Sequence, residues 1–396
     1  MTVKAIMPVR YESGRAAGQT PTAMRATDTA HPQLGELWSD AVEPLIGASL
    51  RPHDVDSSTH RRTPATTPSC RTSRTATATG TTRTTSSGSG PSADSSPPWR
   101  GDHHLSGAPF STADLVKAWL DCRRSKRNSK SAQAFETNVE HNLCRLRDRL
   151  LDGSYRPGRS ICFVVTRPKA REVWAAAFED RIVHHLLYNH IAPRFEAGFI
   201  ANTAACIEGR GTLYAARRLE HDVRSVSCNW KRPAWYLKCD LANFFVAIDK
   251  CRLQRQLHAR VAEPFWRWLT DVVLMHDPRA DFEMRGDRAL LDRVPPHKRL
   301  LNAPANTGLP IGNLSSQFFA NVHLDALDQH AKHRIKARHY GRYVDDFYLL
   351  HESPQWLNAA LTDITAFLPA QLGAQLNPSK TVLQPVERGI DFVGQV

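Results

Sequence analysis

The chain has 396 residues, enough for two or three domains, and carries 52 Lys and Arg against 39 Asp and Glu, for a net charge of +13. This basic balance favours a polyanionic partner, because neutralising phosphates supplies most of the non-specific affinity of proteins for nucleic acids. No apolar run approaches the length of a membrane span and the N-terminus lacks a signal-peptide core, so we expect no membrane association.

The eight cysteines show no close pairs with the spacing of zinc ligands. Several lie within apolar runs, as free buried thiols do. A reducing, cytoplasmic compartment is therefore expected.

Residues 1–110 are predicted to be a disordered extension. From Ser57 to Pro98 the segment consists mainly of Thr, Ser, Arg, Pro and Gly, so it cannot bury enough apolar surface to offset chain entropy. Residues 1–110 together hold eleven Lys and Arg against nine Asp and Glu, a net charge of +2, which leaves +11 for the rest of the chain. This distribution favours nucleic-acid binding by the body of the protein over a merely charged tail. The extension is either a flexible arm that binds nucleic acid or an upstream sequence from a wrongly assigned start codon.

Order is predicted to begin near Ser111, which forms a capping-box pattern with Asp114 ahead of an apolar helical repeat. The spacing of apolar residues over 135–150 predicts one helix that stops at Gly153. The β-branched run 161–165 predicts a strand. A basic run between the two helices is either a solvated loop or a nucleic-acid contact: Arg123, Arg124, Lys126, Arg127 and Lys130.

Two short basic motifs follow. Arg167-Pro168-Lys169-Ala170-Arg171 is, by its charge alone, a surface hairpin. Gly209-Arg210-Gly211 would let the backbone approach a phosphate or a base, because glycine has no side chain. The motif is too short to be specific by itself.

An apolar strand from Trp235 to Cys239 ends in Asp240, and Phe244 and Phe245 follow it. Further on, residues 277–306 are rich in charge and proline. We expect a surface insertion there, to which the sequence assigns no role.

The most informative stretch is 341–350, which predicts two apolar strands joined by a tight turn holding Asp345 and Asp346. Burying two like charges side by side is unfavourable unless a divalent cation offsets them, although such pairs also occur in ordinary hairpin turns. With Asp240 at the end of a neighbouring strand, three carboxylates would form a site for two Mg²⁺ ions. Two such ions clamp the attacking and leaving oxygens of an in-line phosphoryl transfer.

From about residue 135 to its last residue the chain resembles the reverse transcriptases. Asp240 falls at the family's first palm carboxylate and Tyr343-Val344-Asp345-Asp346 at its YxDD box. Between them, residues 308–321 resemble the loop and helix that contact the template and the nucleotide. Three motifs in the right order make a chance match improbable.

The box from Ile311 to Gln317 is similar to that of diversity-generating retroelement enzymes, which copy a template RNA with frequent errors opposite adenine. Ile311 stands where many relatives have Gln, and loss of such a polar contact can cost about 1–3 kcal/mol of discrimination. Phage-defence and group II intron reverse transcriptases share parts of the box and remain alternatives, as does an RNA-binding remnant without activity.

The resemblance implies an α+β right-hand polymerase with fingers over 111–235 and a palm over 236–396, whose antiparallel sheet carries helices on one face. Residues 391–394 resemble the primer-grip hairpin, after which the chain ends. We therefore expect the helical thumb to be absent, as in a fragment or in an enzyme whose clamp comes from a partner.

The resemblance also implies site roles. Asp240, Asp345 and the Leu241 carbonyl would hold two Mg²⁺ ions, for which Mn²⁺ can substitute, and Asp346 would support them. Lys380 would be the general acid for the pyrophosphate leaving group, and Phe245 the steric gate that selects dNTPs. The other implied contacts are Lys169, Arg171, Ile311, Gly312 and Gln317 for the nucleotide, and Arg210, Gly211, Tyr343, Phe392 and Gly394 for the template and primer.

The partners implied are a template RNA, an RNA/DNA duplex, dNTPs and a small basic helical accessory protein, in a bacterial cytoplasm.

Overall fold

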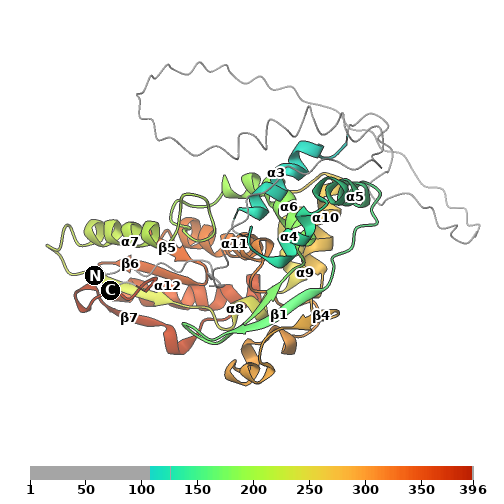
Figure 1. Ribbon diagram of the computed structural model, residues 1–396. Coiled ribbons are helices and arrows are strands. Elements are labelled where there is room, and N and C mark those ends of the chain that lie inside the picture. The colour runs from blue at the N-terminus through green and yellow to red at the C-terminus, as the bar shows by residue number, and fades with distance from the viewer. Residues whose placement is uncertain (1–107, 125, 395–396) are drawn as a thin grey trace, which may run out of the picture.

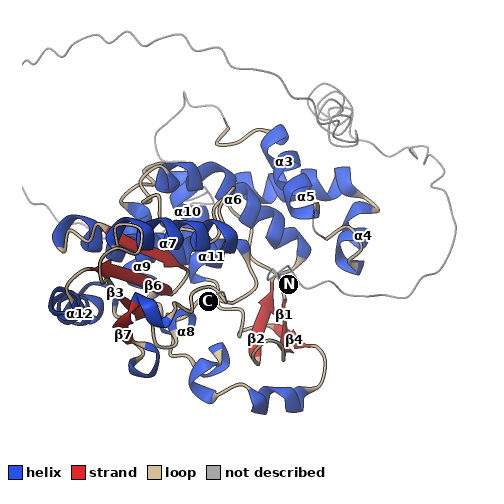
Figure 2. Cartoon of the chain, turned by 90° about the vertical axis from the view of Figure 1, so that its left-hand side faces the viewer, coloured by secondary structure: helices blue, strands red, loops and turns tan. Residues whose placement is uncertain are grey.

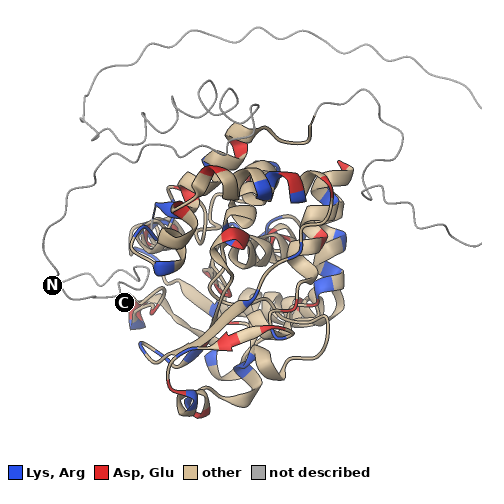
Figure 3. Cartoon of the chain, turned by 45° about the vertical axis from the view of Figure 1, so that its right-hand side comes forward, with Lys and Arg blue, Asp and Glu red and all other residues tan. Residues whose placement is uncertain are grey.

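The computed structural model describes residues 108–124 and 126–394. Apart from its last three residues, the predicted extension 1–110 lies outside the described residues. The rest comprises two β-sheets with helices packed around them (Figures 1 and 2). Lys and Arg are distributed over most of the elements in Figure 3, as expected from the charge of this part of the chain.

The first described helix, α3 (Thr112–Arg123), begins with the predicted capping box. The Ser111 hydroxyl oxygen accepts a hydrogen bond from the Asp114 backbone N–H at 3.2 Å, and the Asp114 carboxylate accepts one from the Ser111 N–H at 2.8 Å. This reciprocal pair satisfies two N–H groups that a helix start leaves without partners.

The single helix predicted over 135–150 is instead two helices, α4 (Lys130–Glu136) and α5 (Val139–Leu151). The Asn142 side-chain amide donates to the Phe135 carbonyl at 2.9 Å across the break. An apolar repeat continues through this break because both helices bury their apolar side, so periodicity alone did not reveal it.

A small sheet has the order β2-β1-β4 and consists of β1 (Ser160–Val165), β2 (Arg171–Ala175) and β4 (Phe282–Met284). β1 pairs antiparallel with β2 and parallel with β4. The predicted strand at 161–165 is therefore confirmed.

The segment 277–306 is not the simple surface insertion that its composition suggested. It provides β4, and Leu300 packs with Cys162 and Trp174 in a small core under the sheet. Its charged residues are mostly exposed, whereas Leu291, Val294 and Leu300 are buried.

The remaining helices form most of the protein's main core. They are α6 (Phe178–Glu196), α7 (Thr212–Val226), α8 (Phe244–Ala247), α9 (Lys250–His258), α10 (Pro264–Met275), α11 (Leu314–Gln329) and α12 (Pro354–Phe367). Within the described ranges, no helix is long and apolar enough to cross a membrane.

The larger sheet is antiparallel and has the order β5-β6-β3-β7. Its strands are β3 (Trp235–Cys239), β5 (His339–Tyr343), β6 (Asp346–His351) and β7 (Val382–Pro385). β5 and β6 form the predicted hairpin, in which Tyr343 pairs with Asp346.

The expectation that helices cover only one face of this sheet is wrong. Leu237 and Leu349 belong to the main core, which also contains buried residues of α11 and α12. On the opposite side, Tyr348 and Leu350 belong to a second cluster with Leu219 of α7. The apolar residues of β6 are consecutive and point alternately to both faces, so both need cover.

Candidate active site

The three predicted carboxylates come from two strands that meet at one edge of the larger sheet. Cys239 of β3 pairs with Phe347 of β6. Asp240, which follows Cys239, and Asp346, which precedes Phe347, therefore lie at the same edge of the sheet. Asp240 is only 4% exposed. The sheet register therefore brings together residues more than 100 positions apart in the sequence, as the motifs predicted.

The turn that carries Asp345 is held in an unusual backbone conformation. Val344 has φ +57°, in the left-handed region that a β-branched residue rarely adopts. The Arg342 guanidinium donates from Nη1 to the Val344 carbonyl at 2.9 Å. Such strain persists only where neighbouring contacts determine the conformation.

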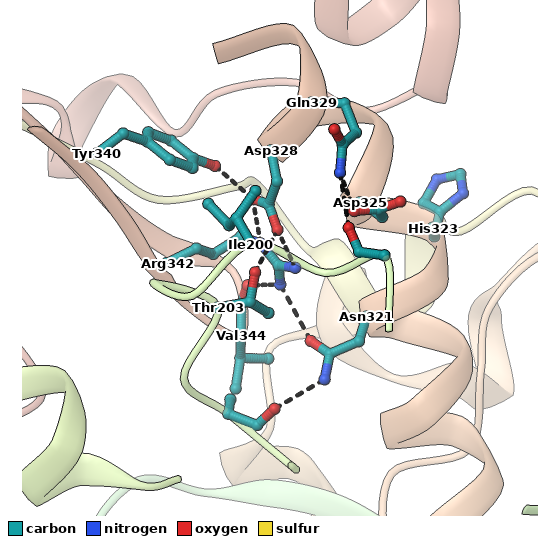
Figure 4. A network of polar contacts seen from close by, with 12 residues as sticks. Ile200, Thr203, Asn321, His323, Asp325, Asp328, Gln329, Tyr340, Arg342 and Val344 are labelled. Atoms are coloured by element: carbon teal, nitrogen blue, oxygen red, sulfur yellow. Dashed lines mark hydrogen bonds and ion pairs between the residues drawn. The ribbon is translucent and has the colours of Figure 1, made fainter. Parts of the chain in front are cut away.

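Arg342 is itself fixed by a buried polar network (Figure 4). Its Nε and Nη2 donate to the two oxygens of Asp328 at 2.8 and 2.7 Å, and neither side chain of this ion pair is exposed. Tyr340 and Thr203 each donate a further hydrogen bond to the Asp328 carboxylate, at 2.6 and 2.7 Å. All four acceptor positions of Asp328 are thus used.

Asn321 completes the support. Its side-chain oxygen accepts from Arg342 Nη1 at 3.1 Å, and its amide donates to the Ala205 carbonyl at 2.7 Å. We call Thr203, Asn321, Asp328, Tyr340 and Arg342 the Asp328 network. It ties the acidic turn to α11 and to the loop before α7.

The carboxylates carry more negative charge than their immediate surroundings neutralise. Burial raises the pKa of Asp345, and the charge of Asp240 adds to the effect. Burial, the charge of Asp345 and a hydrogen bond with Asp240 raise the pKa of Asp346 to about 7. A divalent cation would relieve this repulsion. We call Asp240, Asp345 and Asp346 the carboxylate cluster.

Lys380, in the short 3₁₀ turn Pro378–Lys380, contacts this cluster directly. Its ammonium donates to Asp240 Oδ2 at 2.6 Å, and the Asn377 amide donates to Oδ1 at 3.2 Å. Although burial opposes the shift, the bond to Asp240 and the charges of the other two carboxylates raise the pKa of Lys380. The predicted general acid therefore lies at the site, fully protonated at neutral pH.

The donor chemistry of the cluster suits Mg²⁺ or Mn²⁺, which prefer oxygen ligands. In the part of the chain that the structure describes, no three Asp, Glu, His or Cys side chains are arranged to hold a metal ion. Here the Lys380 ammonium lies against Asp240 instead. By resemblance, the ligands would be the three aspartates and the carbonyl of Leu241, which is buried beside Asp240. This assignment stays a prediction.

The loop 308–313 connects α8, which follows β3, with β2 of the small sheet. The Leu309 N–H donates to the Phe245 carbonyl at 2.7 Å, and the Trp174 N–H donates to the Ile311 carbonyl at 2.7 Å. Gly312 has φ +122°, and a Cβ there would lie 2.8 Å from the Trp174 carbonyl oxygen. Only glycine fits this approach of the loop to β2.

Four predicted nucleotide contacts surround this loop. Phe245 is half-buried while its neighbour Phe244 is buried in the core, and Gln317 is exposed in the first turn of α11. Lys169 and Arg171 are exposed at the end of the β1–β2 hairpin. The Arg171 charge lowers the pKa of Asp345 and so opposes the rise that burial causes.

The predicted template and primer contacts are less clearly assembled. Arg210 donates to the carbonyls of Ile200 and Thr203 at 3.1 and 2.7 Å, so its guanidinium is engaged within the protein. Phe392 is 2% exposed and packs edge-on against Tyr348, with ring centroids 5.1 Å apart.

The other three template and primer predictions lie at the surface or next to the acidic turn. Gly211 and Gly394 have open space around them, with nothing within 4 Å of an added Cβ. Tyr343 is half-buried and directly precedes the acidic turn.

Sequence reasoning missed Asn377 as a partner of Asp240 and missed the Asp328 network. Arg342 gave one signal, because a charged residue stood in an otherwise apolar and aromatic strand. Asp328 gave another, since it follows Leu324 and Leu327 on the buried side of α11. Neither signal identified the partner.

Comparison with known proteins agrees with the motifs. Residues 152–396, more than half of the chain, match the family model described as reverse transcriptase (RNA-dependent DNA polymerase). The chain therefore belongs to the reverse transcriptase family. A search of curated proteins gives no match.

Among solved structures, the chain is similar to a telomerase from Candida albicans in complex with a TWJ fragment of telomeric RNA and to an apo telomerase from Candida tropicalis. Each is 12% identical, with a TM-score of 0.42, over 60% of this chain. The chain spans 44% and 47% of the length of those two chains.

Proposed function

We propose that this chain synthesises DNA on an RNA template, using the carboxylate cluster as its catalytic centre. The observation that carries the proposal is the meeting of Asp240, Asp345 and Asp346 at one sheet edge, with the pKa of Asp346 raised to about 7 by burial and like charge. Uncompensated carboxylates of this kind favour a cation-dependent reaction over a purely structural role.

In this proposal the larger sheet is the palm and the small sheet, with the β1–β2 hairpin, belongs to the fingers. Gly312 and Ile311 fix the loop between them, and the incoming nucleotide would bind against it. Lys169 and Arg171 would neutralise its phosphates, because their side chains are exposed and have no hydrogen-bond partner among the described residues.

Mg²⁺ bound by the carboxylates would supply Lewis-acid stabilisation of the transferring phosphoryl group. The protein's own residues orient the carboxylates and donate a proton. Arg342 holds the turn that carries Asp345, and Asn377 orients Asp240. Lys380, which bonds to Asp240, would donate its Nζ proton to the departing pyrophosphate.

The motif at 311–317 supports the finer proposal of an error-prone, diversity-generating bacterial enzyme working in the cytoplasm with an accessory protein. Ile311 offers no side-chain hydrogen bond to a nascent base pair, so packing alone would hold the pair's geometry. A defence-type or intron-type enzyme would share the same chemistry.

Primer extension on an RNA template with dNTPs and Mg²⁺ tests the proposal. The chain should extend the primer, and Asp345→Asn should abolish extension while retaining the wild-type circular dichroism spectrum. Errors concentrated opposite template adenines would support the diversity-generating subtype. Extension by the Asp345→Asn chain at the wild-type rate would overturn the catalytic assignment.

Phe245 provides a second test, of sugar selection. Its half-buried ring is proposed to exclude the ribose 2′-hydroxyl, so Phe245→Ala should raise NTP incorporation relative to dNTP by about tenfold or more, the scale of a lost steric contact. Single-nucleotide incorporation kinetics measure this ratio. Phe244→Leu is the control, because Phe244 is buried in the core and should leave the ratio unchanged.

A further inference from the structure

A basic cleft lies outside the site described above. It has a volume of about 730 Å³ and is bordered by α9, by the end of α11 and by the end of α12. Its lining includes three arginines, two histidines and three glutamines, and no Asp or Glu. None of these residues belongs to the carboxylate cluster, the acidic turn or the loop 308–313.

The arginines point outward because the helix beneath them buries its other side. In α9 the apolar residues Leu253 and Leu257 are fully buried, so Arg252 and Arg255 lie on the solvent side. Arg255 and Arg334 are exposed, and neither guanidinium group has a hydrogen-bond or ion-pair partner among the described residues. Arg252 Nε lies 3.4 Å from Asp249, and its Nη1 donates to the Ala370 carbonyl at 2.8 Å. Two of the three guanidinium charges of the cleft are therefore uncompensated by the described residues, which favours an anionic ligand.

Two π-helical turns border the cleft, His330–Arg334 after α11 and Leu368–Leu372 after α12. Such turns are rare and occur often at functional sites. The first supplies both histidines and Arg334 to the lining, and the second supplies Gln371. The two neighbouring irregularities thus present side chains to one cleft.

An aromatic surface is also present. The His330 ring stacks on Phe367 with centroids 4.0 Å apart and planes at 21°, and His330 is hydrogen-bonded to Asp363. Stacked rings beside guanidinium groups are a combination that binds unpaired bases and phosphates. The amides of Gln256 and Gln329 bond within the protein. Gln371 is exposed, and its amide can both donate to and accept from a ribose 2′-hydroxyl.

We propose that this cleft binds a single-stranded segment of RNA, a part of the template that is not being copied. Guanidinium groups would bind its phosphates and the His330–Phe367 stack would bind a base. The volume is within the range of pockets that enclose small ligands, which suits one or two nucleotides. The proposal takes its ligand, RNA, from the proposed function, but it concerns binding and not synthesis.

The test uses the full chain and the triple variant Arg252→Gln/Arg255→Gln/Arg334→Gln. A fluorescein-labelled RNA with a short DNA primer is prepared with and without a single-stranded RNA overhang of 12 nucleotides, and binding is measured by fluorescence anisotropy at several salt concentrations. For the overhang substrate, the triple variant should raise Kd at least tenfold. The slope of log Kd against log salt should fall by about 2, since each single-strand phosphate contact contributes about 0.7.

The matched control is Arg288→Gln/Arg293→Gln/Arg388→Gln, which removes the same charge from exposed positions outside the cleft. It should change Kd for the overhang substrate by less than twofold. The cleft variant should bind the substrate without an overhang as the wild type does. Equal weakening by both triple variants would overturn the proposal, because it would mean that only net charge matters.

Photo-cross-linking locates the overhang. With 4-thiouridine in the overhang, cross-links are expected on peptides containing 330–334 or 367–371 and should disappear in the cleft variant. Cross-links confined to other peptides, or equal affinity for an overhang of DNA, would overturn the assignment to RNA. If the wild type synthesises no DNA yet shows these binding contrasts, the proposed function fails and the cleft assignment stands.

Discussion

Two groups of buried charged side chains lie on either side of Val344, and they differ in how fully their charges are neutralised. In the Asp328 network every carboxylate acceptor is used and both charged side chains are fully buried. In the carboxylate cluster burial and like charge raise the pKa of two acids, and among the described residues one cation, the Lys380 ammonium, bonds directly to the cluster.

The difference shows how such a cluster can exist. A set of repelling carboxylates would relax outward unless the backbone carrying them were fixed. The bond from Arg342 to the Val344 carbonyl couples the satisfied network to the unsatisfied cluster. The network thus stabilises a turn whose own charges oppose it, as expected where strain is retained for function.

Breaking the Asp328 network should have the largest effect on stability. Asp328→Asn leaves the Arg342 charge buried without its partner, and removing one member of a buried ion pair costs about 3–5 kcal/mol. Urea denaturation followed by circular dichroism measures the loss. Glu220→Gln, in the exposed pair with Arg224, is the control and should cost under about 1 kcal/mol.

A double variant sharpens this result. Asp328→Leu/Arg342→Met replaces both charges by apolar side chains and should be less destabilised than Asp328→Asn, since no charge remains unpaired. It should still synthesise DNA poorly, because the Val344 carbonyl loses its donor. A loss below about 1 kcal/mol in Asp328→Asn would show that the network does not hold the turn.

Removing a charge from the carboxylate cluster should stabilise the protein, whereas breaking the Asp328 network should destabilise it. In metal-free buffer at pH 8, Asp346→Asn should raise the free energy of unfolding, on the order of 1–2 kcal/mol, because it removes one of three repelling charges. The folded pKa of Asp346, about 7, lies above its ordinary value of 3.8. The folded state therefore binds more protons in that interval, and wild-type stability falls as pH rises through it.

The pH dependence provides the check. The difference between Asp346→Asn and the wild type should be largest above pH 7 and should vanish below about pH 4, where the carboxyl is protonated in both folded and unfolded states. Thermal denaturation across this range in EDTA measures it. A variant less stable than the wild type at pH 8 would show that the cluster is held by favourable contacts.

The same contrast explains which parts could be predicted from the sequence. The carboxylate cluster depends on an acid that ends an apolar strand and on two acids in a hairpin turn, and these are local patterns. The match to the reverse transcriptase family confirms the resemblance by which these three residues were identified. The roles of its residues stay predictions.

The Asp328 network could not be predicted, because its members come from segments up to 139 residues apart, from Thr203 to Arg342. Pattern rules describe neighbours on one helix or strand and not such distant partners. The second face of the larger sheet was missed for the same reason. The sequence around Ala215, Leu219 and Val223 does not indicate which sheet their helix packs against.

Among these variants, substitution of Lys380 should give the smallest change in the free energy of unfolding. Its side chain is 45% exposed, so Lys380→Gln should cost less than about 1 kcal/mol despite the 2.6 Å contact with Asp240. If Lys380 protonates the pyrophosphate, kcat for nucleotide addition should nevertheless fall by about 10²–10⁴ with little change in KM.

Lys380→Arg separates the two roles of this residue. Arginine keeps the ion pair with Asp240 but cannot release a proton at working pH. It should therefore retain wild-type stability and lose kcat as Lys380→Gln does, and the alkaline limb of the kcat–pH profile should disappear in both variants. Restoration of kcat by arginine would show that the ammonium acts only as a counter-charge, and the carboxylate cluster would then resemble the Asp328 network in needing a fixed cation.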